Sequence, residues 1–322
     1  DSEPDTDLSL AMKSVLQVRK PVAEAWFVTT NAVLAKVDPS HGPTQAAAIV
    51  NRVYRETPPV SRRDATEFAS FCAAWIDAHT QPINPSDMLT FEEWLEGTQY
   101  TLAEKAKITA AVDEQFPKRH DPKLRKRKAF VKDEEYAKIN HARLICAGED
   151  LFKGIFGPYW KVVENQIFSL PHFAKHIPRV DLADALVGLA AKVMPILIEG
   201  DDCIYFDGTL YLVGDFESYE SLLVVALTRA IERRALRRIH LHTLSEDLAL
   251  LADEVYGWDG RPTTVHTNQV QAKGPARRFS GDNQTSLGNG LANFLIWLFI
   301  QSNNLPITPD TFLRYGFRIK LS

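Results

Sequence analysis

The stretch that most constrains the fold is residues 196–220, ILIEGDDCIYFDGTLYLVGDFESYE. β-branched and aromatic residues dominate it, interrupted by two acidic turns, which is typical of strands. The dipeptide Asp207-Gly208 is typical of a two-residue hairpin turn, and such a turn would place Tyr205 opposite Leu210. We therefore predict an antiparallel strand pair within an α+β fold.

The predicted hairpin gathers three carboxylates at one strand end. They are Asp201, Asp202 and Asp215, and the register leaves open whether Asp201 or Asp202 faces Asp215. Like charges crowded at an apolar strand end destabilise the fold unless a cation neutralises them. Carboxylate oxygens suit hard divalent ions, so these residues indicate a Mg²⁺ or Mn²⁺ site for phosphate chemistry. The alternative is an exposed acidic turn, in which Asp and Gly serve only as turn formers.

A second motif begins at Ser280, where the sequence reads SGDNQTSLGNGLAN. A Ser-Gly turn leads into a predicted helix, on which Thr285, Asn289 and Asn293 recur every four residues along one face. The pattern resembles SGxxxTxxxNxxxN, motif B of the RNA-dependent RNA polymerases of positive-strand RNA viruses. This resemblance implies that Ser280, Gly281, Thr285 and Asn289 contact the nucleotide. The alternative is a helix with a polar stripe and a capping serine.

The sequence DFESYE, which begins at Asp215, resembles motif A in the DxxSFE form of tombusvirus-like and noda-like polymerases. Tyr219 stands where that family usually has Phe, and Glu217 is an additional acid. The resemblance implies that Asp215 binds the catalytic metal ions and that Glu220 works with Asn289 to recognise the ribose 2′-hydroxyl. A site that hydrogen-bonds this hydroxyl rejects deoxynucleotides, because its buried polar groups would otherwise lose their partner.

A third motif lies upstream, where FVKDE (residues 130–134) and RLI (residues 143–145) resemble motif F. In the family these basic residues hold the triphosphate. The resemblance therefore implies that Lys132 and Arg143 bind the nucleotide phosphates, with Lys128 and Lys138 as helpers. Arginine suits bidentate phosphate contacts, and lysine acts as a point charge. Together the motifs cover about residues 128–322.

The motif order departs from that of most of these enzymes, in which a GDD hairpin follows motif B. The only GDD here is residues 200–202, ahead of motif A, and the interval between motif B and residues 316–320 is too short for another hairpin. The order C-A-B resembles that of permutotetravirus and birnavirus polymerases. It is topologically permitted, because a short turn can join two antiparallel neighbours. The alternative is a fortuitous GDD in a chain whose true motif C is missing.

The resemblance also implies a reaction, the transfer of a nucleotide to an RNA 3′-hydroxyl. Two Mg²⁺ ions about 3.5–4 Å apart would be held by Asp215 and Asp201, with Asp202 assisting. Residues 316–320 resemble the strand of motif D, which implies that Lys320 protonates the pyrophosphate. The alternative for Lys320 is an exposed lysine with no role in the reaction.

The fold that the resemblance implies is a right-hand polymerase with fingers and palm, in which helices flank an antiparallel palm sheet. We expect an N-terminal helical or fingers region at 1–115, fingers with motif F at 116–195, and a palm with motifs C, A, B and D at 196–322. Apolar spacing predicts helices within 22–37 and 68–76. The sequence stops soon after motif D, so we expect that the thumb is absent and that the chain is a fragment.

Template-directed RNA synthesis during viral genome replication is the function that we expect. A reverse transcriptase is one alternative, although it is expected to lack motif B and Asn289. A catalytically incomplete, polymerase-derived module that binds RNA or nucleotides is another. The expected partners are RNA template and primer, nucleoside triphosphates, and a further polymerase segment or replication proteins. The expected location is a replication complex in the host cytoplasm.

The composition restricts the other kinds of site that the chain can contain. The formal net charge is −4, so a nucleic-acid site has to be local, for example at the basic run 118–128 or at the arginine cluster 233–238. Charge runs are more often solvated surfaces, and the arginines can also pair with Glu232. Three widely spaced cysteines form neither a disulfide framework nor a zinc pattern. The most apolar stretch, 291–300, is too short to span a membrane.

Overall fold

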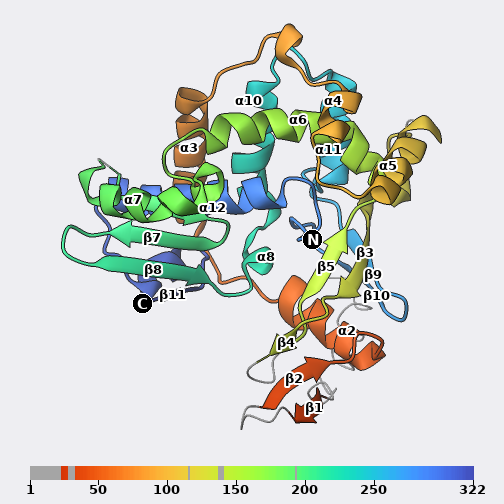
Figure 1. The fold of residues 1–322 in the computed structure, drawn as a ribbon, viewed down its shortest axis with the longest axis horizontal. Coiled ribbons are helices and arrows are strands. Elements are labelled where there is room, and N and C mark those ends of the chain that lie inside the picture. Colours follow the sequence, from red (N-terminus) through yellow and green to blue (C-terminus); the bar gives the residue numbers. More distant parts are fainter. Residues whose placement is uncertain (1–22, 28–32, 115–116, 137–140, 193) are drawn as a thin grey trace.

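The computed structural model describes residues 23–27, 33–114, 117–136, 141–192 and 194–322, and these form a mixed α+β fold with three sheets (Figure 1). The strands are β1 (Ala23–Phe27), β2 (Val33–Val37), β3 (Lys126–Val131), β4 (Glu135–Tyr136), β5 (Leu144–Ala147), β6 (Ile196–Glu199), β7 (Asp202–Phe206), β8 (Tyr211–Phe216), β9 (Thr263–His266), β10 (Gln271–Gly274) and β11 (Ile319–Leu321).

The α-helices are α2 (Gly42–Ala48), α3 (Arg62–His79), α4 (Phe91–Glu96), α5 (Leu102–Glu114), α6 (Asp150–Phe168), α7 (Leu182–Val187), α8 (Tyr219–Leu222), α9 (Val225–Thr228), α10 (Arg234–Ile239), α11 (Glu246–Val255), α12 (Thr285–Ser302) and α13 (Pro309–Arg314). Shorter turns are η1 (Ile49–Val53), η2 (Pro85–Asp87), η3 (Pro122–Arg125), η4 (Ala174–His176), η5 (Arg179–Asp181), η6 (Gly188–Ala191) and η7 (Arg229–Arg233).

The sheet with strand order β11-β8-β7-β6, which we call the acidic sheet, is antiparallel throughout. Its inner face packs on α12, as the alternation of buried and exposed residues along β8 requires. Tyr205 stacks on Trp297 of α12, with ring centroids 5.7 Å apart. A Cβ at Gly214 would lie 2.6 Å from the Trp297 ring, so glycine permits this close contact between helix and sheet.

The main hydrophobic core joins α12 to α3, α6, α10 and α11. Helix α3 begins at a capping serine, because Ser61 accepts a hydrogen bond from the Asp64 amide, and it buries Phe68, Cys72 and Ile76 on one face. Phe68 meets Phe299 of α12 edge to face, with centroids 5.2 Å apart. The predicted helix at 68–76 and the predicted helix that carries Thr285, Asn289 and Asn293 are thus confirmed, as α3 and α12. None of the helices that the structure describes is long and apolar enough to cross a membrane.

The sheet with strand order β10-β9-β3-β5, which we call the basic sheet, lies away from the acidic sheet, across α8 in Figure 1. Its strand β3 pairs antiparallel with β5 and parallel with β9. Burial alternates along β3, so that Arg127, Ala129 and Val131 face the core. Strands β9 and β10, from the proposed palm segment, therefore join strands of the proposed fingers segment. The boundaries at 115 and 195 stay a prediction.

The helix predicted within 22–37 is wrong. Residues 23–27 and 33–37 form the antiparallel strands β1 and β2, and β2 also pairs with β4. A short apolar run is compatible with both a helix and a buried strand, so its pattern alone does not distinguish the two. One of the two partners of β2, the strand β4, lies about a hundred residues further along the chain, so local spacing could not reveal that pairing.

The register predicted for the central hairpin is also wrong, by two residues. Tyr205 faces Leu212, and residues 207–210 form a four-residue loop. The reason lies in Asp207, whose Oδ1 accepts hydrogen bonds from the amides of Thr209 (2.7 Å) and Leu210 (2.6 Å) and so extends the turn. Because the shift is an even number of residues, each side chain stays on the predicted face of the sheet.

Candidate active site

One row of charged residues crosses all four strands of the acidic sheet. Lys320 is paired with Asp215, Asp215 with Asp202, and Asp202 with Glu199. Directly opposed residues of antiparallel strands project from the same face. The register therefore decides that Asp202 faces Asp215, while Asp201 lies in the turn between β6 and β7.

Gly200 and Asp201 form the two-residue turn between β6 and β7, and Asp202 is the first residue of β7. Gly200 has a φ of +59°, which glycine adopts without strain at the first position of such a turn. Asn293 of α12 fixes the turn to the helix, since its Nδ2 donates to the carbonyl oxygens of Gly200 (3.1 Å) and Asp202 (2.9 Å). Its side chain is fully buried. The sequence pattern included Asn293 but gave it no role.

The two facing aspartates have raised pKa values. Burial raises the pKa of Asp202 most, and the charges of Asp201, Asp215 and Glu199 raise it further. Burial and Asp201 also raise the pKa of Asp215, which Lys320 lowers in part. A cation placed among these carboxylates would relieve this repulsion.

Among the residues that the structure describes, no three acidic, His or Cys side chains are arranged as a ready metal site. Magnesium commonly binds one or two carboxylates and completes its shell with water and substrate phosphates. The facing pair Asp202 and Asp215, with Asp201 in the adjoining turn, fits that mode of binding.

Lys320 lies at the edge of the row on β11. Its Nζ is 3.4 Å from Glu217 Oε1, and its side chain is 70% exposed. The lysine therefore stands beside the carboxylates with its charge accessible from solvent.

The loop after β8 is held by two arginines that the sequence analysis missed. Arg52 Nε lies 3.3 Å from Glu220 Oε1, and Arg55 Nη2 lies 3.6 Å from Glu217 Oε2. Arg55 also donates to the hydroxyl of Ser218, at 3.3 Å. Arg52 belongs to η1 and Arg55 follows it, in the segment 1–115, for which the sequence predicted no site residue. Their spacing of three residues is the only sequence signal, and it is too common to identify a site.

Ser280 and Gly281 fasten the start of the motif B segment to β5. The Ser280 hydroxyl donates to the Leu144 carbonyl (3.0 Å) and accepts from the Cys146 amide (3.3 Å), and the Gly281 amide donates to the Cys146 carbonyl (3.0 Å). A Cβ at Gly281 would lie 2.8 Å from that carbonyl oxygen. The Thr285 hydroxyl donates to carbonyls of its own turn. In this structure the polar groups of Ser280 and Thr285 are thus engaged with backbone.

Asn289 and Glu220 have different partners. Asn289 Oδ1 accepts a hydrogen bond from Arg278, which is buried beside Glu232 at 3.5 Å. Tyr219, next to Glu220 in the chain, donates its hydroxyl to the Asn289 carbonyl at 3.1 Å. The structure thus ties motif A to motif B through Tyr219, while the Glu220 carboxylate is paired with Arg52.

Comparison with known proteins gives matches in structure alone. No family model matches the chain, and neither does any curated protein sequence. The chain is similar to the structure of the birnavirus VP1-VP3 complex, with a TM-score of 0.56 and 14% identity over 90% of this chain. It is also similar to the RNA polymerase VP1 from infectious pancreatic necrosis virus, with a TM-score of 0.57 and 14% identity over 90% of this chain. The chain thus has a polymerase-like fold, similar to part of the birnavirus RNA polymerase structures.

This polymerase fold confirms the predicted resemblance to viral RNA polymerases at the level of architecture. The chain covers 47% of each of the two matched chains, so it spans about half of their length. At 14% identity the likeness concerns the fold, and the chemistry of individual residues has to be argued from their positions.

Within this polymerase fold, the two motif F residues lie side by side. The Lys132 amide donates to the Arg143 carbonyl at 2.8 Å. Glu134 bridges their side chains, at 2.9 Å from Lys132 Nζ and 3.7 Å from Arg143 Nη1. The Lys132 and Arg143 side chains are 42% and 53% exposed. Lys128 lies on the outer face of β3, and Lys138 lies outside the described residues.

Three arginines of the cluster 233–238 form ion pairs with acidic residues of other helices. Arg233 and Arg237 pair with Asp253, and Arg234 pairs with Asp77. The predicted pairing of these arginines with Glu232 is wrong, because Glu232 is buried beside Arg278 and pairs with it instead.

Proposed function

We propose that this chain contains the fingers and palm of an RNA-dependent RNA polymerase whose motifs follow the permuted order C-A-B. The observation that carries the proposal is the contact of three separate motifs at one point. Asp202 of the GDD faces Asp215 of motif A, and Asn293 of the motif B helix holds the GDD turn by two hydrogen bonds. A fortuitous GDD would have no reason to lie in this register.

In this proposal Asp215 and Asp201, assisted by Asp202, hold Mg²⁺ or Mn²⁺. The bound ion supplies charge neutralisation at the triphosphate and lowers the pKa of the primer 3′-hydroxyl. The protein itself contributes mainly positioning and a fixed arrangement of charges, as in phosphoryl transfer generally. Burial raises the pKa values of Asp202 and Asp215 most and the neighbouring carboxylates raise them further, and such an ion would offset that repulsion.

The remaining roles follow the same proposal. Lys132 and Arg143 bind the triphosphate, since both are exposed and adjacent and share one carboxylate. Glu220 and Asn289 read the ribose 2′-hydroxyl, and Arg52 and Arg278 orient them. Ser280, Gly281 and Thr285 fix the loop that presents Asn289. Lys320 holds a proton beside the row of carboxylates and can give it to the pyrophosphate.

The partners of the proposed enzyme are an RNA template with its primer and nucleoside triphosphates. Because the chain spans about half of the matched structures, we propose that a further polymerase segment supplies the thumb. One matched structure is a complex of VP1 with VP3, which supports a second viral protein as a partner. The proposed place of action is a replication complex in the host cytoplasm.

Primer extension tests the proposal. The chain, alone and joined to any further polymerase segment, is supplied with a primed RNA template, ribonucleotides and Mg²⁺ or Mn²⁺, beside Asp201→Ala and Asp215→Ala. Both variants should lose extension, whereas Glu199→Ala, at the end of the same row, should retain it. Normal extension by Asp201→Ala would show that the GDD is not the catalytic motif. Preference for deoxynucleotides would indicate a reverse transcriptase, and metal-dependent nucleotide binding without extension would indicate a binding module.

A further inference from the structure

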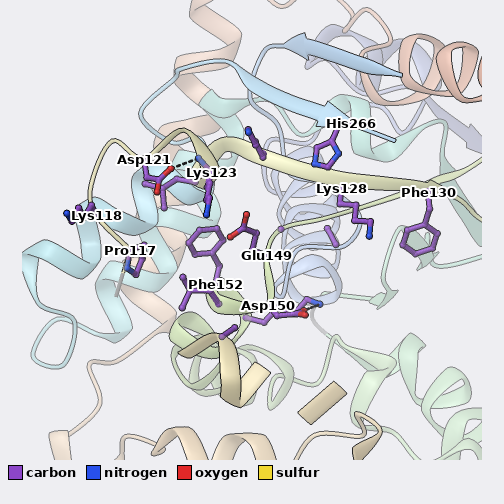
Figure 2. Close-up of a pocket in the computed structure, with 17 residues that line it drawn as sticks. Pro117, Lys118, Asp121, Lys123, Lys128, Phe130, Glu149, Asp150, Phe152 and His266 are labelled. Carbon is purple, nitrogen blue, oxygen red and sulfur yellow. Dashed lines mark hydrogen bonds and ion pairs between the residues drawn. The ribbon is translucent and has the colours of Figure 1, made fainter. Parts of the chain in front are cut away.

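A buried ion pair lies beside Asn289, and its acidic member has no part in the proposed reaction. The side chains of Glu232 and Arg278 are 3% and 2% exposed, with Arg278 Nε 3.5 Å from Glu232 Oε1. Burial of two charges carries a large desolvation cost, so stability alone does not explain the pair. Neither residue lines the cavity of about 1040 Å³ on the outer face of the basic sheet (Figure 2). The buried pair therefore acts on a ligand only through residues that it holds.

Arg278 connects the pair to Asn289 with its guanidinium group. Nη2 donates to Asn289 Oδ1, and Nη1 donates to the Thr285 carbonyl at 2.8 Å. Its backbone is fixed as well, since the Arg278 amide donates to the Leu223 carbonyl at 3.3 Å. A guanidinium is planar, so the contact of Nε with Glu232 also sets the direction in which Nη2 points. The position of the Asn289 side chain thus depends on Glu232.

The helical segment that carries Glu232 departs from regular geometry at this residue. Its turn η7, between α9 and α10, is π-helical, and such turns occur frequently at functional sites. Arg52, which pairs with Glu220, also lies in a π-helical turn, η1. The two residues proposed to read the ribose hydroxyl, Glu220 and Asn289, are therefore both oriented by charged residues of π-helical turns.

The residue before Asn289 is a glycine, and the ion pair explains its presence. Gly288 lies inside α12, where glycine is less favourable than alanine. A Cβ at Gly288 would lie 2.7 Å from Glu232 Oε1 and 2.8 Å from Arg278 Nη1. Any larger residue would displace the two charged groups. The glycine thus weakens the helix but permits close contact between α12 and the pair.

We propose that Glu232 is a positioning residue for sugar selection, which in its ionised form fixes Arg278 and thereby holds Asn289 where it reads the ribose 2′-hydroxyl. Asn289 has this role only within the proposed polymerase function, on which the inference therefore rests. What is added is that the choice of sugar depends on a buried charge that touches no substrate.

The charge on Glu232 changes within the pH range of an assay. Burial raises its pKa most, to about 7, while the Arg278 cation and a hydrogen bond from Gln284 (3.2 Å) lower it. The carboxylate is therefore mostly protonated at pH 6 and mostly ionised at pH 8, so the hold on Asn289 should strengthen as the pH rises. Among the described residues, the charged or titratable groups that face Glu232 are Arg278 and Asp282 ahead of α12, Tyr219 of α8 and Tyr256 after α11.

Primer extension with ATP and with dATP tests the proposal. The ratio of kcat/KM for ATP to kcat/KM for dATP measures sugar selection, and it cancels the pH dependence of the chemical step that both substrates share. For the unaltered chain this ratio should rise about 2- to 10-fold from pH 6 to pH 8, the effect of about one hydrogen bond. Glu232→Gln, which has the shape of the protonated residue, should show the low ratio at both pH values.

The matched control is Glu254→Gln. Glu254 is also 3% exposed and paired with two arginines, Arg119 and Arg125, but it lies on α11. This variant should keep the ratio and the pH dependence of the unaltered chain. Gly288→Ala should lower the ratio without removing a charge, because its Cβ would displace the pair. A ratio that rises with pH in Glu232→Gln as in the unaltered chain would overturn the proposal, because another acid, such as Asp282, would then be the group that titrates.

A second measurement separates this inference from the polymerase function. In nuclear magnetic resonance spectra, the side-chain amide of Asn289 is the signal that disappears in Asn289→Asp. It should shift with a midpoint near pH 7 in the unaltered chain and stay constant in Glu232→Gln. Such a shift in a chain that never extends a primer would support the link from Glu232 to Asn289 and count against the polymerase function. Extension with no shift, and with a ratio independent of pH, would overturn the role of Glu232 and leave the polymerase function standing.

Discussion

The hydrogen bonds from Asn293 to the GDD turn lead to a quantitative prediction. Asn293→Leu retains the size of the side chain and its place in α12 but removes both hydrogen bonds, leaving the carbonyls of Gly200 and Asp202 without this donor. A hydrogen bond contributes about 0.5–1.5 kcal/mol net, so the two together should lower the free energy of unfolding by about 1–3 kcal/mol. Asn293→Asp should be worse, because it sets a carboxylate against two carbonyl oxygens.

The catalytic consequence should exceed the loss of stability. If the turn moves by about 1 Å, the aspartates are misplaced, and misplacement of that order can reduce a rate about 10²-fold. We therefore expect Asn293→Leu, assayed by primer extension well below its melting temperature, to have a much lower kcat. It should also show a smaller rise in melting temperature on addition of Mn²⁺.

The matched control is Asn303→Leu, at the exposed end of the same helix, where the amide donates to the Phe299 carbonyl at 2.8 Å. This variant should keep the kcat and the Mn²⁺ response of the unaltered chain. Equal kcat and equal Mn²⁺ response in Asn293→Leu and Asn303→Leu would refute the argument that Asn293 positions the carboxylates.

Three further predictions concern stability. Burial and neighbouring carboxylates raise the folded-state pKa of Asp202, so the chain should lose stability as the pH rises from the unfolded-state pKa through the folded-state pKa. In EDTA at pH 7, Asp202→Asn should therefore unfold at a higher urea concentration than the unaltered chain. A lower urea midpoint for Asp202→Asn would contradict this prediction. Gly281→Ala should cost about 1–3 kcal/mol by urea denaturation, because its Cβ would lie 2.8 Å from backbone, whereas Gly188→Ala meets nothing within 4 Å and should not destabilise. Burial raises the pKa of Glu232 to about 7, so the unaltered chain should lose stability relative to Glu232→Gln between about pH 4.5 and pH 7, and parallel curves would show that Glu232 does not titrate there.

The parts of the fold that the sequence predicted are those set by local pattern. Alternating residues and turn signals located the hairpin that carries Asp202 and Asp215, and apolar spacing located α3 and α12. The hairpin register failed because one side chain, Asp207, caps its own turn and lengthens the loop. The strands β1 and β2 were predicted as helix because their short apolar runs do not distinguish a helix from a strand, and the pairing of β2 with the distant strand β4 leaves no local signal.

The residues of the candidate site also fall into those that local sequence patterns predicted and those that they did not. Its carboxylates, and the pair Lys132 and Arg143, were predicted because short motifs carry them. Arg52 and Arg55 were missed, since nothing near them in the sequence marks a pair of arginines that reaches residues more than 160 positions away. The lysines of the outer face of β3 were visible as a charge run, but which of them share a face became clear only from the strand register.

The proposed permuted order of motifs is compatible with this site for a geometric reason. The contacts that assemble the site are antiparallel pairings between neighbouring strands and two hydrogen bonds from Asn293, and none of them depends on the order in which the chain visits the strands. Placing the GDD turn ahead of β8 needs only a short loop between β7 and β8, and residues 207–210 supply it. A chain that instead carried the GDD after motif B would need a connection from α12 back to β7, yet it would place Asp202 opposite Asp215 in the same register. The chemistry of the site is therefore fixed by the order of strands across the sheet, while the order of motifs along the chain determines only which loops connect them.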